Sequence, residues 1–87
     1  NDDVSIIQDN LNAFYLDGNM IINNSTVFNA KDIKLFNMLG QLVVHHPNVY
    51  EQVNHIEIPM TALSQGVYII QFNYNDDIKI SKQIIIK

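Results

Sequence analysis

A chain of 87 residues with no cysteine and a formal net charge of −4 is long enough for one small domain, without disulfides or thiolate–metal bonds. The acidic balance argues against a nucleic-acid binder, which needs a basic face toward phosphate, and against a polybasic membrane anchor. No apolar run approaches the roughly 20 residues of a spanning helix, so we expect no membrane insertion.

The first residues, 1–3, are polar and acidic, and we interpret them as the end of a linker before a domain at 4–87. They lack the basic start of a signal peptide, so a signal peptide for export is expected on a preceding part of a larger protein. Short apolar segments predict strands at 4–8, 13–16 and 20–22, separated by turns and followed by a polar loop at 23–25.

The clearest pattern is a β-hairpin with strands at about 32–37 and 41–45. Apolar and charged residues alternate in its first strand, as in a strand with one face in a core. Asn37 stands where a type I turn favours a short polar side chain, and Gly40 where the chain needs a positive φ to enter the return strand. Any other residue at position 40 is expected to cost on the order of 1 kcal/mol.

A loop is predicted at 47–54, because Pro47-Asn48 interrupts the strand pattern. Its apolar residues are expected to point inward as anchors: Val49, Tyr50 and Val53. A half-buried strand at 56–58 follows, and Pro59 ends it.

The remaining segments complete the fold. A single helical turn at 60–63 is expected to place Leu63 in the core. Strands at 66–74 and 78–86 then follow, joined by a tight turn at Asn75-Asp76, because both residue types tolerate a left-handed φ.

About seven short strands without a credible helix predict an all-β fold, a small antiparallel β-sandwich of immunoglobulin-like architecture. Lys82 interrupts the apolar set of the last strand. We therefore expect Lys82 at an edge or end of the sheet, where its amine extends outward to solvent.

No catalytic or metal-binding constellation emerges from the sequence. His45 and His46 are adjacent, so on a strand they point to opposite faces, and neither they nor His55 has a carboxylate or cysteine at ligand spacing. Asp76-Asp77 is expected to be a solvated turn, with a weak calcium site as the alternative. Motifs of hydrolases, phosphate-binding loops and zinc proteases are absent, so we expect no enzyme and no cofactor.

Several aromatic residues permit two interpretations: Phe14, Tyr15, Tyr50, Phe72 and Tyr74. They could form the sugar-binding face of an accessory module, or they could pack with Phe14 and Phe72 in the core and the tyrosines at its rim. The second interpretation is favoured, because core aromatics are expected in a domain of this size. Tyr68 either bonds the backbone of a neighbouring turn through its hydroxyl or belongs to a surface that a partner contacts.

Three ordered motifs carry a family resemblance. The first is the hairpin with Asn37, Leu39, Gly40 and Gln41; the second is Leu63, Gly66 and Tyr68; the third is the terminal strand with Lys82, Ile84, Ile85, Ile86 and Lys87. The set closely resembles the C-terminal sorting domain of proteins exported by the bacterial type IX secretion system. The resemblance covers about 33–87, in a variant that lacks the Pro-Asn-Pro motif of many members at 8–12.

The resemblance implies a non-catalytic signal on a larger cargo protein. Such domains are recognised in the periplasm by the outer-membrane translocon with its shuttle and sortase-like components, and the cargo ends on the cell surface or outside the cell. Members are often cut off after export. The residues of the terminal strand are then candidates for partner recognition. A sugar- or protein-binding module and a structural spacer stay open as alternatives from the residues alone.

Overall fold

The computed structural model describes residues 11–60 and 63–87, and all regular structure in them is β-strand. Every strand pairing is antiparallel. The prediction of an all-β sandwich is confirmed, with six strands in the described residues. Their bounds are β1 Asn12–Leu16, β2 Asn19–Asn37, β3 Leu42–His46, β4 Tyr50–Pro59, β5 Gly66–Tyr74 and β6 Ile78–Ile86.

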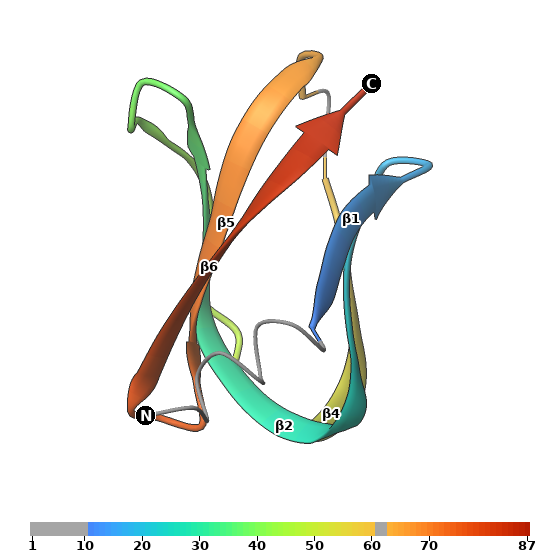
Figure 1. The fold of residues 1–87 in the computed structure, drawn as a ribbon, viewed down its shortest axis with the longest axis vertical. Helices are drawn as coiled ribbons and strands as arrows, with labels where there is room; N and C mark the ends of the chain where they lie inside the picture. Colours follow the sequence, from blue (N-terminus) through green and yellow to red (C-terminus); the bar gives the residue numbers. More distant parts are fainter. Residues whose placement is uncertain (1–10, 61–62) are drawn as a thin grey trace.

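One long strand, β2, belongs to both layers of the sandwich (Figure 1). Its first part pairs with β1 on one side and β4 on the other, which makes the first layer. Its last part pairs with β3 and β5, and β6 follows β5, which makes the second layer. In Figure 1, β2 curves at the bottom of the view from the layer of β1 and β4 to the layer of β5 and β6.

The polar segment 23–25 is part of this strand, so the predicted loop is wrong. The register between β2 and β4 is interrupted between Asn23 and Phe28, where Ser25, Thr26 and Val27 are exposed. The Asn24 side-chain oxygen accepts a hydrogen bond from the Ser25 backbone amide at 3.0 Å. The polar residues thus mark a bend in the strand and not its end, because β2 pairs with β4 both before and after them.

The predicted loop at 47–54 is also largely strand, since β4 begins at Tyr50. A bulge hides the pattern: Gln52 has a φ of 54°, and its backbone amide donates to the side-chain oxygen of Asn29 at 2.8 Å. Tyr50 and Val53 pack against the core as expected, whereas Val49 is 63% exposed and is no anchor. Pro59 ends the strand as predicted.

The predicted tight turns are confirmed by their backbone angles. Asp17 and Gly18, between β1 and β2, have φ values of 50° and 83°. Asn75 and Asp76, between β5 and β6, have φ values of 49° and 71°. Leu63 packs against the core as expected. The predicted strand at 4–8 and part of the predicted helical turn at 60–63 lie outside the described residues.

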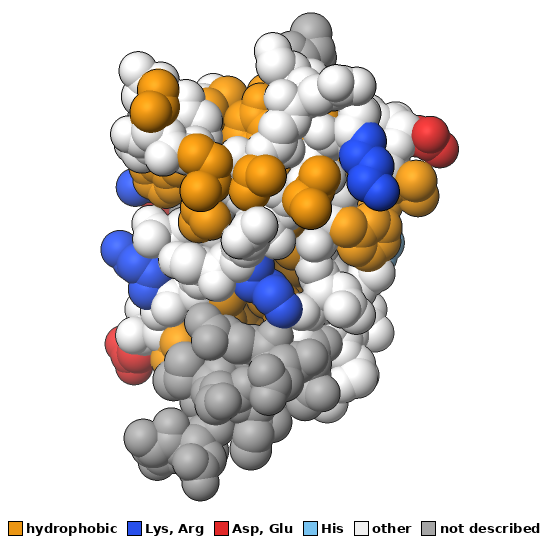
Figure 2. Space-filling model, turned by 45° about the horizontal axis from the view of Figure 1, so that its top comes forward, with side chains coloured by type: hydrophobic (Ala, Val, Ile, Leu, Met, Phe, Trp, Pro, Cys, Tyr) orange, Lys and Arg blue, Asp and Glu red, His pale blue; other side chains and the backbone are white. Residues whose placement is uncertain are grey.

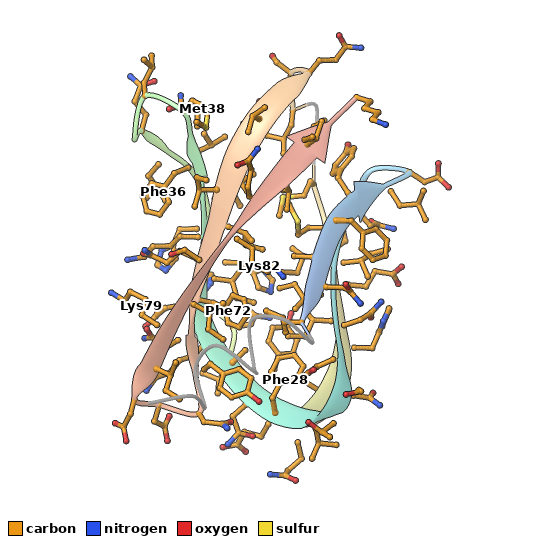
Figure 3. The ribbon with its side chains drawn as sticks, in the orientation of Figure 1. Phe28, Phe36, Met38, Phe72, Lys79 and Lys82 are labelled. Atoms are coloured by element: carbon orange, nitrogen blue, oxygen red, sulfur yellow. The ribbon has the colours of Figure 1, made fainter. Side chains whose placement is uncertain are left out.

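The core fills the space between the two layers, where Phe28 and Phe72 lie in Figure 3. The rings of Phe28 and Tyr74 stack with centroids 5.6 Å apart. Phe72 is in the core as predicted, but the expectations for two other aromatics are wrong: Phe14 is 38% exposed, and Tyr74 is only 4% exposed. The described residues contain no helix of the length and apolarity needed to cross a membrane.

Replacing Phe72 by leucine is expected to lower the free energy of unfolding by about 1–3 kcal/mol, because it removes buried contacts at a side chain that is 1% exposed. The matched change Phe14→Leu on the partly exposed ring is expected to cost less than about 0.5 kcal/mol. Urea unfolding of both variants measures the difference. Equal losses would contradict the assignment of the core.

Candidate functional site

The three histidine side chains contact three different residues. His45 lies 3.8 Å from a carboxylate oxygen of Asp32, the His46 ring bonds the Tyr50 hydroxyl, and the His55 ring bonds the side chain of Asn23. Within residues 11–60 and 63–87, no group of three or more histidine, aspartate or glutamate side chains could hold a metal ion. The histidines therefore act as local structural contacts.

Among the residues that the structure describes, His46 and Tyr50 are in contact and each has a shifted pKa. Their rings stack with centroids 5.8 Å apart, and His46 Nε2 lies 2.6 Å from the Tyr50 hydroxyl. Burial, together with the neighbouring His45, lowers the pKa of His46, and burial raises the pKa of Tyr50. Both shifts favour the neutral pair, in which the tyrosine hydroxyl donates to the imidazole nitrogen.

The aromatic residues do not form one platform for a sugar. Phe14 and Tyr15 are neighbours on β1 and point to opposite faces, and Tyr50 stacks on His46. Phe72 and Tyr74 are buried. Two surface depressions have volumes of about 40 and 130 Å³, well below the several hundred Å³ of ordinary ligand sites.

The terminal strand β6 lies at the end of the sheet order and, in the described part of the chain, pairs only with β5. Its inward residues Ile84 and Ile86 are each 3% exposed, and Ile80 is fully buried. Ile85 points outward and is 55% exposed, and Lys87 follows the strand as an exposed residue. The three isoleucines of the terminal motif therefore divide between two faces, with only Ile85 accessible.

Lys82 does not extend outward, as the sequence led us to expect. It lies on the inward face of β6, opposite the buried Ile70, and between the layers in Figure 3. Its amine donates a hydrogen bond to the backbone carbonyl of Leu11 at 2.6 Å. Lys82 does lie on a strand at the end of the sheet order. Its amine, however, points inward and links β6 of the second layer to Leu11, which precedes β1.

The hairpin turn has the predicted geometry. The Asn37 side-chain oxygen accepts hydrogen bonds from the backbone amides of Leu39 and Gln41 at 2.9 and 3.0 Å. The Asn37 side-chain nitrogen donates to the side chain of Gln41 at 2.8 Å, and Gly40 has a φ of 82°. Asn37, Gly40 and Gln41 thus close the turn, while Leu39 is 84% exposed.

Tyr68 has the structural role that was one of its two interpretations. Its ring is 7% exposed, and its hydroxyl donates to the Ser64 carbonyl at 2.8 Å, which holds the segment that leads into β5. A Cβ at Gly66 would lie 3.8 Å from the Tyr68 ring, so the two residues are close neighbours.

Sequence reasoning concentrated on buried positions and missed apolar residues on the outside of the second layer. Val67 and Ile69 alternate with the buried Tyr68 and Ile70 on β5 and point outward. The available signal was the unbroken apolar run over 67–70, which is typical of a strand that is apolar on both faces.

Replacing Asn37 by alanine is expected to lower the free energy of unfolding by about 1–2 kcal/mol, because one side chain satisfies two backbone amides of the turn. The control Gln41→Ala removes only a side-chain bond at the surface, and a loss below about 0.5 kcal/mol is expected. Chemical denaturation measures both. A loss no greater for Asn37→Ala than for the control would refute the proposed role of Asn37.

Acidification is expected to weaken the fold through His46. Its pKa in the folded chain lies below its ordinary value of 6.5, so the unfolded chain binds the proton more readily. The stability from this site is complete above about pH 6.5 and falls as the pH drops further. Melting temperatures between about pH 7.5 and 5.5 should therefore fall more for the native chain than for His46→Gln. Parallel curves would contradict this.

Comparison with known proteins agrees with the arrangement of these segments. Residues 12–87 match the family described as the secretion system C-terminal sorting domain. No curated protein matches the chain. The match begins at the first residue of β1 and extends through all the strands, including the Asn37 turn, the Tyr68 segment and the terminal strand. The chain belongs to the family of C-terminal sorting domains of the type IX secretion system.

Proposed function

We propose that the domain is a non-catalytic address label, which directs a larger cargo protein across the outer membrane through the type IX secretion system. The observation that carries this proposal is the family match over 12–87. Domains of this family are sorting signals of cargo proteins, and the proposal assigns that role to this chain.

The machinery contacts the terminal strand in this proposal, through Lys82, Ile84, Ile85, Ile86 and Lys87. A strand at the end of a sheet offers backbone groups that a partner strand can pair with. The buried Ile84 and Ile86 hold β6 in the sandwich. Ile85 and Lys87 are exposed and are the side chains that a partner can touch directly.

The later steps follow the family pattern. The label of a periplasmic cargo is recognised by the type IX machinery, which includes an outer-membrane translocon, a shuttle component and a sortase-like peptidase, and the cargo crosses the outer membrane. The peptidase cuts the label off, and the cargo is attached to surface lipopolysaccharide or released. The label performs no reaction in any of these steps.

The test is a reporter with a signal peptide and this chain at its C-terminus, produced in a host that has the type IX machinery. Reporter on the cell surface or in the medium, and its retention in a translocon-deficient strain, are the expected results. Equal export by both strains would refute the proposal.

Deleting residues 84–87 from the fusion is expected to abolish export while the reporter itself still folds. The deletion also removes buried isoleucines, so the control is Phe28→Leu, which loosens the core at a residue of β2 that lies opposite Val53 on β4. Export of the control together with retention of the deletion variant assigns the effect to β6. Normal export of the deletion variant would overturn the role of the strand.

A further inference from the structure

An apolar row crosses the outer face of the second layer. Phe36 on β2 lies opposite Leu42 on β3 and opposite Ile69 on β5. Val67, two residues before Ile69 on the same face, lies opposite Ile85 on β6. Because opposite residues and residues two apart share a face of a sheet, these side chains form one continuous surface. We call Phe36, Leu42, Val67, Ile69 and Ile85 the outer stripe.

The outer stripe is accessible, and the hairpin turn extends it. Leu42 and Ile85, at its two ends, are 52% and 55% exposed. Met38 and Leu39 in the adjoining turn are 64% and 84% exposed. Figure 3 shows Phe36 and Met38 on the outside of the layer, and Figure 2 shows apolar side chains gathered across the upper half of the molecule. A surface of this kind on a small domain is typical of an interaction site.

Lysines flank the stripe although the chain as a whole carries a net charge of −4. Lys34 lies two residues before Phe36 on β2, and Lys87 lies two residues after Ile85. Neither forms an ion pair within the described part of the chain. By contrast, Lys31 is 3.4 Å from a carboxylate oxygen of Asp76. Lys34 shares a surface depression with Lys79 and Asp32, two lysines to one aspartate, so the charge beside the stripe is positive although the domain is acidic.

We propose that the outer stripe, with Lys34 and Lys87, is the docking surface for a protein of the export machinery whose matching surface is apolar with an acidic rim. The proposal rests on the proposed function and adds a side-chain surface to the strand edge. The two are continuous, because Ile85 belongs to both. A strand added beside β6 would extend the layer and its outer face.

The charges beside the stripe favour a protein partner with an acidic rim over a second copy of the chain and over a lipid surface. A second copy of the chain would bring its own Lys34 and Lys87 to the contact, and like charges there repel. A lipid surface is bound by clusters of several basic residues, whereas two lysines flank the stripe on a domain of net negative charge. An acidic rim on a protein partner complements the lysines, and its apolar centre covers the stripe.

The test places carboxylates on the stripe in the whole-chain reporter fusion. Leu42→Glu and Ile85→Glu are compared with Leu16→Glu and Val27→Glu, whose side chains are 53% and 54% exposed away from the stripe. Export is expected to fall at least about tenfold for the stripe variants. For the controls it should stay within about twofold. Thermal melts of all four variants check that the fold is retained.

Site-specific photocrosslinking identifies the occupant. A crosslinking residue at position 42 or 85 is expected to capture a component of the type IX machinery, and one at position 16 or 27 is not. Neutralising the charge by Lys34→Gln should reduce this capture at low ionic strength, whereas Lys31→Gln should leave it unchanged. Capture of lipid alone, or of a second copy of the chain alone, would overturn the proposal.

The experiment separates the two levels of inference. If the native fusion is not exported through the type IX machinery, the proposed function fails. If it is exported and folded stripe variants are exported at the same rate, the docking surface is wrong while the proposed function stands.

Discussion

The pairing of β2 with four other strands is the constraint on which the fold depends. Its first half is hydrogen-bonded to β1 and β4, and its last half to β3 and β5. The two layers therefore cannot separate without breaking one continuous strand at its bend. Only β6 lies outside these pairings: in the described part of the chain it depends on β5, on its inward isoleucines and on the Lys82 contact with the first layer.

Lys82 gives β6 a contact that an apolar residue could not. An amine between two layers costs free energy unless it is hydrogen-bonded, and the Leu11 carbonyl accepts a bond from it at 2.6 Å. An inward charge on a strand at the end of a sheet also opposes indiscriminate pairing, because a strand added there would have to accommodate the charge. The inward charge of Lys82 thus makes indiscriminate strand addition beside β6 less favourable.

The sequence predicted those parts of the fold in which residue type and position agree. Asn37 was predicted to bond the turn backbone and Gly40 to adopt a positive φ, and both predictions are confirmed. Errors arose where the two signals conflict. The bulge at Gln52 shifts the alternation of β4, and polar residues at the bend of β2 look like a loop. For Lys82 the period-2 pattern pointed inward and its charge suggested outward, and the pattern was the better guide.

The same alternation of inward and outward residues fixes the register of β6. A slip of the strand by one residue would turn Ile84 and Ile86 outward and bring Ile85 inward. It would also turn Lys82 away from the Leu11 carbonyl, so that slipped register loses buried isoleucines and a hydrogen bond together. The inward residues of β6 therefore fix which of its side chains are exposed. The buried half of the strand thus determines which side chains the exposed half presents at the surface.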